Sequence, residues 1–516
     1  MHDLKVSGLQ APLTGQPKRN LVSPDSLFWL VLVSVAFLGA ELTPALLRMP
    51  LGADELTYIA RTSVHASGVS LPPVHGQGMG LLAAPVTLFT MSLTAIRIWM
   101  SVLSAVGLFL AVLCWRGLRP MWVLGLAELI LASLAITQNS GVQIYPDWWG
   151  ALGLLALTGL FLRAVNGTMR ARVVLPLIGF TSLVIVLMRP QNVVFLMGPA
   201  ILACLVVRSW RNLRVLAAMA VGTALGFLEW LAGAYLWFGG LFGRINLAGQ
   251  EPPSLHPYWA LGTQLRSLNG PWYCIPPDCS GWAVPYETPW WLAFLGIAIL
   301  GLWVGWRRSA MKASSVLAGA TALWVFLLYA FLVPFGAPRY LLPTYALMSI
   351  LIADGIVWAV TESRRRKLAA VAACLFVLGG IVSQRAILQR QAYYQTITRP
   401  YQAQAQELEK IGIHPPCVLS NTSIAYYIGC SAPWTTNGSN MQIVTRFLAE
   451  RTPQGLKYWR PLPLPMPHLL VPAPGGNPPV VFLPASSPVV RSAQSIAHAK
   501  AKFESIGTAF DFPGSN

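Results

Sequence analysis

The side chains best suited to chemistry begin with an adjacent acidic pair, Asp54 and Glu55, directly after an apolar segment at 27–47. Carboxylates beside hydrocarbon are costly and are usually kept for function. If the stretch is helical, Asp54 and Tyr58 lie one turn apart on one face, and Glu55 points elsewhere. One carboxylate could then act on a substrate while the other orients it or binds a cation. The alternative is a capping role, because acids in a first helical turn complement the helix dipole.

A third acid, Asp147, opens the apolar segment 147–165. It is either functional or an ordinary helix N-cap. Arg189 stands between two short apolar segments, where an arginine normally faces a cavity or pairs with an acid or a phosphate. Snorkelling of Arg189 to the interface is the competing explanation.

A further arginine, Arg339, precedes a late apolar segment and is followed by Tyr340. A guanidinium gives bidentate contacts to phosphate oxygens. The tyrosine adds a hydroxyl group and an aromatic face. Taken alone, this Arg-Tyr pair is a weak signal.

Apolar segments must position these residues, because the chain has 516 residues, is 55% hydrophobic and only 10% charged, and has a mean hydropathy of +0.56. That composition excludes a soluble protein. Runs near the ~20 residues that cross a bilayer core predict about eleven transmembrane helices. They lie at 27–47, 94–115, 120–137, 147–165, 173–188, 192–207, 213–237, 289–306, 313–333, 341–361 and 368–384.

Lys and Arg mark every second loop, which predicts that those loops are cytoplasmic. The basic residues are Lys18, Arg19, Arg116, Arg119, Arg163, Arg170, Arg172, Arg208, Arg211, Arg214, Arg307, Arg308, Lys312, Arg364, Arg365, Arg366 and Lys367. Residues 1–26 are then a cytoplasmic tail without a cleavable signal, and 27–384 form a membrane module with outer loops at 48–80 and 238–288. Because the net charge of +18 is split among loops, nucleic-acid binding is not favoured.

The last segment, 385–516, is predicted to be a small extracytoplasmic α/β domain. Helices are expected at 394–411, 441–450 and 487–506, strands at 417–420 and 480–484, and a Pro-rich surface linker at 461–479. Outside the cytoplasm, Cys274 with Cys279 and Cys417 with Cys430 are candidates for two local disulfides; four free thiols are the alternative. No His pair accompanies them, so zinc is not expected.

In their order along the chain these features resemble the GT-C superfamily of polytopic glycosyltransferases, which includes protein mannosyltransferases, aminoarabinose transferases and arabinofuranosyltransferases. The resemblance rests on Asp54-Glu55 with Tyr58, a Pro-rich run at 72–85, Asp147, Arg189-Pro190 and Arg339-Tyr340-Leu-Leu-Pro343. It covers about 380 residues as topology, but only these short motifs match residue by residue.

The resemblance implies a membrane enzyme of the cell envelope that moves a sugar from a polyprenyl phosphate to an acceptor hydroxyl outside the cytoplasm, with inversion. Asp54 would be the general base. Glu55 or Asp147 would position the acceptor or hold a divalent cation, so a cofactor stays open. Arginine would stabilise the departing phosphate.

One departure affects phosphate binding. Some members carry Lys in the Pro-rich run, where this chain has His75 and Gln77. His75 could substitute, although it is charged only part of the time near neutral pH. Phosphate binding is then expected to depend more on Arg339 and on Arg244 or Arg266 in the large loop. The alternatives are a transporter or lipid flippase, and an inactive scaffold of the same fold.

Overall fold

The computed structural model describes residues 26–60, 62–63, 72–249, 256–268, 288–398, 401–410, 418–419 and 422–430, and five short strands beyond them. The described part of the membrane module is helical. Its elements are α1 (Phe28–Glu41), α2 (Pro44–Leu47), α3 (Ala53–Ile59), α4 (Gly78–Thr87), α5 (Leu93–Leu113), α6 (Met121–Ser133), α7 (Ala135–Val142), α8 (Pro146–Val165), α9 (Ala171–Met188), η1 (Val193–Met197), α10 (Gly198–Val206), η2 (Arg208–Trp210), α11 (Leu213–Trp237), α12 (Leu241–Gly249), α13 (Leu261–Ser267), α14 (Thr288–Arg307), α15 (Ser309–Leu332), η3 (Pro338–Leu341), α16 (Leu342–Glu362) and α17 (Arg366–Thr398).

Each of the eleven predicted segments coincides with a helix or a helix pair. Within the described residues, eight helices are long and apolar enough to cross a membrane, so the chain is a polytopic α-helical membrane protein. A ninth span is possible if α6 and α7, which are bent by 78° at Leu134, act as one. The apolar helices at Phe28–Glu41 and Val193–Val206 are shorter, so the total of eleven stays a prediction.

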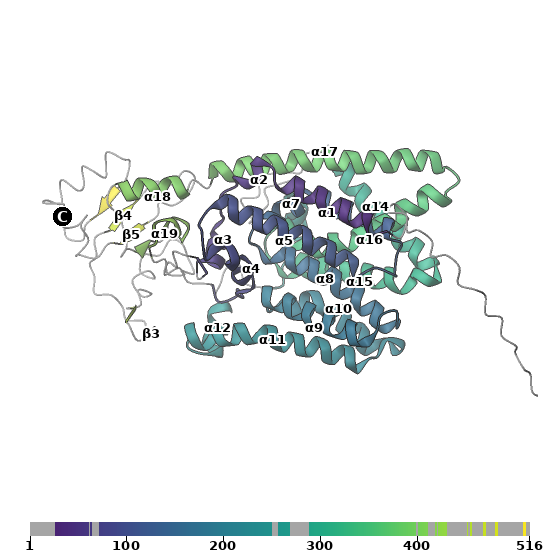
Figure 1. Ribbon diagram of the computed structural model, residues 1–516, viewed down its shortest axis with the longest axis horizontal. Helices are drawn as coiled ribbons and strands as arrows, with labels where there is room; N and C mark the ends of the chain where they lie inside the picture. Colours follow the sequence, from purple (N-terminus) through teal and green to yellow (C-terminus); the bar gives the residue numbers. More distant parts are fainter. Residues whose placement is uncertain are drawn as a thin grey trace, which may run out of the picture.

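The long helices run side by side (Figure 1), and α8 and α16 lie at their centre. Most residues of these two helices are buried, whereas α11 and α17 expose most of their length at opposite flanks. Small residues let α16 approach α14 closely: a Cβ on Gly301 would lie 1.7 Å from the Leu351 carbonyl oxygen. The central helices therefore hold α16, and η3 just before it, in a fixed position.

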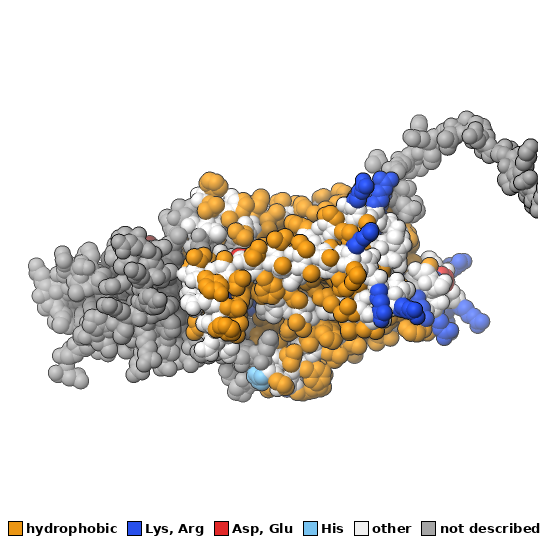
Figure 2. All heavy atoms as spheres, turned by 90° about the horizontal axis from the view of Figure 1, so that it is seen from below, with side chains coloured by type: hydrophobic (Ala, Val, Ile, Leu, Met, Phe, Trp, Pro, Cys, Tyr) orange, Lys and Arg blue, Asp and Glu red, His pale blue; other side chains and the backbone are white. Residues whose placement is uncertain are grey.

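Charge is distributed unevenly along the bundle. Figure 2 shows apolar side chains covering the visible face of the bundle, with Lys and Arg gathered at the end opposite α3 and α4. That end also contains a buried ion pair, in which Arg119 Nε lies 2.9 Å from Asp354 Oδ1. The Arg119 guanidinium also donates to the hydroxyl oxygens of Ser314 at 2.8 Å and Ser315 at 2.9 Å, which joins the α5–α6 loop to α15 and α16.

The C-terminal segment continues from α17 into α18 (Tyr401–Lys410) and α19 (Thr422–Ile428). Four short strands pair antiparallel in the order β1-β5-β4-β6, namely β1 (Val418–Leu419), β4 (His468–Leu470), β5 (Val480–Phe482) and β6 (Ala509–Asp511). A separate hairpin joins β2 (Arg451–Thr452) to β3 (Gly455–Leu456).

Two local expectations for this segment are corrected. The membrane helix continues to Thr398 and α18 begins after Pro400, because a proline cannot continue a helix. The region expected to be a Pro-rich linker contributes strand β4, which pairs on both sides. Strands near 417–420 and 480–484 are confirmed, while the helices expected at 441–450 and 487–506 lie outside the described residues. The α/β domain itself stays a prediction.

Candidate active site

Four charged side chains from distant parts of the chain form a continuous row. Asp54 Oδ2 lies 3.2 Å from Arg339 NH2, and Arg339 Nε lies 3.4 Å from Asp147 Oδ2. The other oxygen of Asp147 lies 3.0 Å from Arg189 NH1. Two carboxylates and two guanidiniums therefore alternate, with Asp54 at one end, 43% exposed, and the Asp147 side chain at only 4%. We call these residues the charged row.

Helix ends place all four members of the charged row. Asp54 lies in the first turn of α3, which is helical as expected and follows the extended Gly52. Asp147 lies in the first turn of α8, just after Pro146, a residue preorganised for that position.

The two arginines lie where apolar helices end or begin. Arg189 is the residue at which α9 stops, in an extended conformation with φ −153° and ψ 121°. A π-helical turn, η1, follows, so the expected break between two short apolar segments is present. Arg339 lies in η3, a single 3-10 turn that leads into α16. Both arginines thus stand at the ends of apolar helical segments.

Tyrosine rings enclose the two guanidiniums. The guanidinium carbon of Arg339 lies 4.4 Å from the Tyr145 ring centroid and 5.4 Å from that of Tyr340. Arg189 lies 5.1 Å from Tyr340, which stacks on Tyr329 at 5.1 Å. Cation–π contacts of this kind hold an arginine without neutralising its charge.

Sequence reasoning missed Tyr145 and Tyr329 as site residues. For Tyr145 a signal existed, since it stands two residues before Asp147. Tyr329 lies inside α15, and nothing in its surrounding sequence distinguishes it from other apolar residues of that helix.

Glu55 does not join the charged row. Its carboxylate is fully buried and pairs with Arg97, with Oε1 2.5 Å from NH1. It also accepts hydrogen bonds from the backbone N–H of Gly52 at 2.7 Å and of Ile144 at 2.8 Å. The expected catalytic or cation-binding role therefore does not match its surroundings, which use every oxygen for internal contacts.

The contacts of Glu55 indicate a positioning role instead. Arg97, at the start of α5, donates to the carbonyl oxygens of Met49, Pro50 and Val142 as well as to Glu55. This network joins α3 to the loop before α8, which contains Tyr145 and leads into Asp147. It thereby fixes Asp54 relative to Asp147.

The loop before α4 carries His75 and Gln77 and brings His75 against Tyr58 of α3. The rings of Tyr58 and His75 lie 4.9 Å apart. A Cβ on Gly76 or on Gly78 would lie 2.6 Å from the Leu187 carbonyl oxygen, so only glycine allows this loop to pack on the end of α9. Because Arg189 follows two residues after Leu187, the packing places the loop beside the row.

Arg244 and Arg266, the two loop arginines expected to bind phosphate, have other surroundings. Arg244 of α12 is fully buried and donates to the carbonyl oxygens of Pro73 at 2.9 Å, Trp230 at 2.5 Å and His75 at 2.7 Å. It therefore braces the loop that carries His75. Arg266 lies exposed at the end of α13.

Several polar atoms at this site are buried without a hydrogen-bond partner among the described residues. They are Tyr58 Oη, His75 Nδ1, Gln77 Nε2 and Arg189 Nε; Asp147 Oδ2 and Arg339 Nε also lack a hydrogen bond, but they face each other as an ion pair at 3.4 Å. Buried polar groups are usually paired, and each unpaired group needs an explanation. Their concentration around one cluster of charges is the arrangement expected of a binding site for a polar ligand.

The charge states follow from burial. The pKa of His75 is lowered to about 4, chiefly by burial and also by the nearby Arg189, Arg339 and Arg244, while Asp54 acts in the opposite direction. Burial raises the pKa of Tyr58 above its ordinary value. Both side chains are therefore neutral at pH 7, so His75 does not supply the positive charge expected of a phosphate ligand.

The three acids do not fit a divalent cation. Glu55 is committed to Arg97, and the two remaining carboxylates each lie against a guanidinium. In the described residues, no three His, Cys, Asp or Glu side chains lie together as a metal site would need. The guanidiniums of Arg189 and Arg339, which flank Asp147, can instead donate hydrogen bonds to an anionic ligand.

The cysteines outside the site agree in part with expectation. Cys114, Cys204 and Cys374 are free, as expected of the three cysteines in membrane helices. Cys430 is disulfide-bonded. Cys274, Cys279 and Cys417 lie outside the described residues, so both proposed pairings stay predictions.

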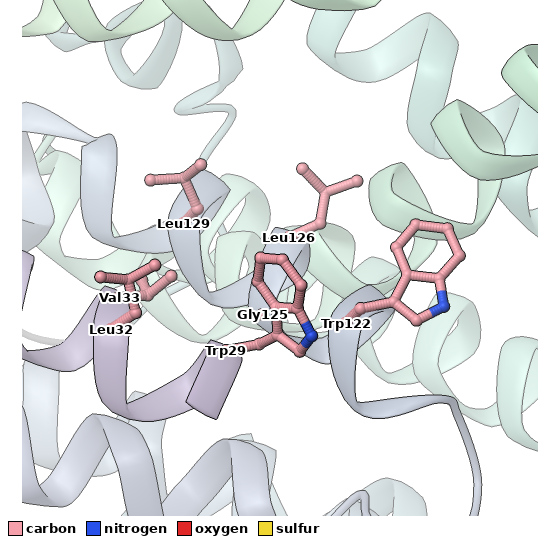
Figure 3. A pocket seen from close by; sticks show the side chains of 7 residues that line it. All are labelled: Trp29, Leu32, Val33, Trp122, Gly125, Leu126 and Leu129. Carbon is pink, nitrogen blue, oxygen red and sulfur yellow. The ribbon is translucent and has the colours of Figure 1, made fainter. Parts of the chain in front are cut away.

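An apolar groove lies apart from these residues, between α1 and α6 (Figure 3). It has a volume of about 450 Å³ and is lined by Trp29, Leu32, Val33, Trp122, Gly125, Leu126 and Leu129. Its side chains are hydrophobic or aromatic, and no member of the charged row reaches it. The side chains that line the groove therefore supply no acid, base or charged group to the charged row.

Known structures share this fold. The crystal structure of ArnT from Cupriavidus metallidurans bound to undecaprenyl phosphate matches with a TM-score of 0.53 at 15% identity, over 78% of this chain and 85% of that one. The archaeal oligosaccharyltransferase AglB from Archaeoglobus fulgidus matches with a TM-score of 0.43 at 11% identity, over 80% of this chain and 61% of that one.

The likeness to ArnT shows that the chain has the polytopic GT-C fold, as the sequence motifs suggested. The lower AglB score adds nothing to that conclusion. No family model matches the sequence, and no curated protein matches it closely enough to count as a relative. At 15% identity the likeness defines the fold alone, and the chemistry must be argued from the site.

Proposed function

We propose that this chain is a membrane glycosyltransferase that moves a sugar from a polyprenyl phosphate to an acceptor hydroxyl on the extracytoplasmic side. The observation that carries the proposal is the charged row, which places a partly exposed carboxylate, Asp54, beside two buried guanidiniums, Arg339 and Arg189. Transfer of a sugar from a phosphate needs a base for the acceptor hydroxyl and cations for the leaving phosphate, and the charged row contains both.

The cations fit a phosphate leaving group. A sugar phosphodiester carries one negative charge, and cleavage of the sugar–oxygen bond adds a second. Arg339 and Arg189 can each offer a guanidinium edge to the phosphate oxygens, and they are held before substrate arrives. Preorganised positive charge stabilises the charge that develops in the transition state more than that of the ground state.

Asp54 fits the role of base. Its side chain is the most exposed member of the charged row, so an acceptor can approach it. Asp54 takes the proton of the acceptor hydroxyl, the acceptor oxygen bonds to the anomeric carbon, and the bond from that carbon to the phosphate oxygen breaks. The bonding electrons leave with the phosphate. A single displacement of this kind inverts the anomeric centre.

The side of the membrane supports a lipid-linked donor. The Lys and Arg side chains gather at the end of the bundle opposite α3, and such residues mark the cytoplasmic side. The site therefore faces away from the cytoplasm, where nucleotide sugars are made. A sugar carried across the membrane on a polyprenyl phosphate is available there. The bound undecaprenyl phosphate of the similarly folded ArnT agrees with this donor class.

Transfer by purified protein tests the proposal. The full chain in lipid nanodiscs is incubated with radiolabelled polyprenyl-phosphate sugars and with glycan, lipid and peptide acceptors. We expect label to move to one acceptor class, with release of polyprenyl phosphate. Glu362→Gln is the matched control, because Glu362 is 52% exposed at the basic end and pairs with Arg308. Movement of intact donor across a bilayer without transfer would instead support a flippase.

A further inference from the structure

Three uncharged side chains lie beside the charged row and have no assigned task. Tyr58 is 3% exposed, and its Oη has no hydrogen-bond partner among the described residues. His75 Nδ1 and Gln77 Nε2 are buried and unpaired in the same way. An unpaired polar atom in a protein interior costs free energy, so three together indicate groups kept for a ligand.

Their position relates them to the phosphate site. Tyr58 lies one turn from Asp54 on α3, and its ring contacts that of His75. The charges of Asp54, Arg189 and Arg339 all act on both Tyr58 and His75. Tyr58 and His75 thus lie next to the base and the two guanidiniums, and Gln77 follows His75 two residues later in the same loop.

The backbone that carries His75 and Gln77 is firmly anchored. Arg244 donates to the carbonyl oxygens of Pro73 and His75, and Trp230 Nε1 donates to Pro73 at 3.1 Å. The Gln77 backbone N–H donates to Glu229 Oε2 at 3.1 Å. Anchored groups lose little freedom when they bind, which favours recognition of one ligand geometry.

Their chemistry differs from that of the row. A phosphate needs positive charge, which Arg189 and Arg339 supply. Hydroxyl groups need neutral donors and acceptors, and the phenol, imidazole and amide here offer both. The faces of the Tyr58 and His75 rings also provide apolar surface for the C–H groups of a sugar ring.

We propose that Tyr58, His75 and Gln77 form a neutral subsite that binds the hydroxyl groups of the donor sugar, next to the arginines that bind its phosphate. The subsite rests on the proposed function, because it assumes a sugar joined to a phosphate. In this subsite His75 recognises the sugar and not the phosphate. The loop that carries His75 and Gln77 determines which sugar binds.

Two probes separate sugar binding from phosphate binding. Undecaprenyl phosphate without a sugar reports on the arginines alone. The same lipid carrying glucose, mannose or arabinose reports on the arginines and the subsite together. Dissociation constants for both are measured with the full chain in nanodiscs. We expect wild-type protein to bind one of the sugar-bearing lipids at least tenfold more tightly than the bare lipid phosphate.

Variants then locate the difference. Tyr58→Phe and Gln77→Leu each remove hydrogen-bonding atoms and keep the approximate shape. We expect each to weaken binding of the sugar-bearing lipid roughly three- to tenfold, the effect of one neutral hydrogen bond, and to change binding of bare undecaprenyl phosphate less than twofold. Arg339→Ala should weaken both. If Gln77→Leu lowers the melting temperature, Tyr58→Phe, which removes a single oxygen atom, decides the question.

The outcomes are distinct. Equal weakening of both probes by Tyr58→Phe would place this residue at the phosphate and overturn the subsite. No effect on either probe would also overturn it, as would wild-type protein that binds both probes equally. Failure of wild-type protein to bind bare undecaprenyl phosphate would instead overturn the proposed function, and the subsite with it.

Discussion

Asp54 and Glu55 are neighbours in the sequence, yet their carboxylates face different partners. Asp54 pairs with Arg339 at the partly exposed end of the charged row, whereas Glu55 is fully buried against Arg97. Helix α3 turns about 100° per residue, which separates them. Asp54 thereby faces the partly exposed end of the charged row, and Glu55 holds in place the helix that carries Asp54.

Replacement of Asp54 should separate turnover from donor binding. Asp54→Asn keeps the shape of the side chain and removes the base, so we expect kcat to fall roughly a hundredfold or more. It also removes a negative charge 3.2 Å from Arg339, so the affinity for polyprenyl phosphate should not weaken. Single-turnover transfer and lipid binding measure the two effects. Near-normal turnover would make the acid structural.

Replacement of Glu55 should reduce activity by misplacing Asp54. Removing one partner of a buried ion pair costs roughly 3–5 kcal/mol, so Glu55→Gln should lower the melting temperature in detergent. Asp354→Asn is the matched control, because it breaks the buried Arg119 pair at the opposite end. We expect both variants to be less stable and only Glu55→Gln to lower kcat per folded molecule. An equal loss of kcat would argue against positioning.

Exchange of Arg339 for lysine tests whether phosphate binding depends on the planar guanidinium group. Arg339 meets two carboxylates through different nitrogen atoms and lies against the Tyr145 ring. Lysine keeps the charge but offers a single ammonium group. We expect Arg339→Lys to weaken undecaprenyl phosphate binding at least tenfold. Lys312→Arg, at the basic end, should leave binding unchanged and serves as the control.

Acidification should destabilise the protein through His75. Its pKa is about 4 when folded, against an ordinary value of 6.5, and the charged groups that act on it are Asp54, Arg189, Arg339 and Arg244. The unfolded chain therefore binds more protons between pH 6.5 and 4, and stability falls as pH falls. From pH 7 to 5 the loss is about 1–2 kcal/mol. In melting curves, His75→Gln should remove that part of the pH dependence; identical curves would contradict the burial of a neutral imidazole.

The disulfide of Cys430 should close a short loop to Cys417. Cys430 is bonded, and a loop of this size contributes on the order of 2–3 kcal/mol. Thiol labelling of unreduced, denatured protein should modify Cys114, Cys204 and Cys374 only, provided that Cys274 also pairs with Cys279. Mass spectrometry of the unreduced peptides identifies the partners. A peptide joining Cys430 to Cys274 or Cys279 would disprove the pairing.

The sequence predicted the helices of this protein well, because roughly 20 apolar residues and flanking charges are local signals. The break at Arg189-Pro190 was equally readable, since proline stops a helix. Arg339 and Asp147 could be singled out because charge beside an apolar helix is rare. Their meeting depends on packing between α8 and η3, which lie almost 200 residues apart and which no local pattern specifies.

The partner of each charged group could not be read from the sequence. The sequence alone does not separate the roles of Asp54 and Glu55, because both are acids at the start of the same helix. Their roles differ because Arg97, 42 residues later, pairs with Glu55. Arg244 looked like a phosphate ligand, but its guanidinium donates to the carbonyl oxygens of Pro73 and His75, in a loop far away in the chain. Such assignments depend on long-range geometry, whereas residue type only restricts the choices.

Helix α17 is longer than a membrane span requires. Its 33 residues extend about 50 Å at 1.5 Å per residue, and a bilayer core takes up about 30 Å. The remainder projects past the membrane at the end that carries α3 and leads into α18 (Figure 1). There α19 meets the membrane module where Tyr426 Oη and Ser63 Oγ lie 3.1 Å apart. The projecting end of α17 thus leads to α18 and α19, and α19 packs beside α3, which carries Asp54; on the proposed function, we expect these helices to limit how bulky an acceptor can be.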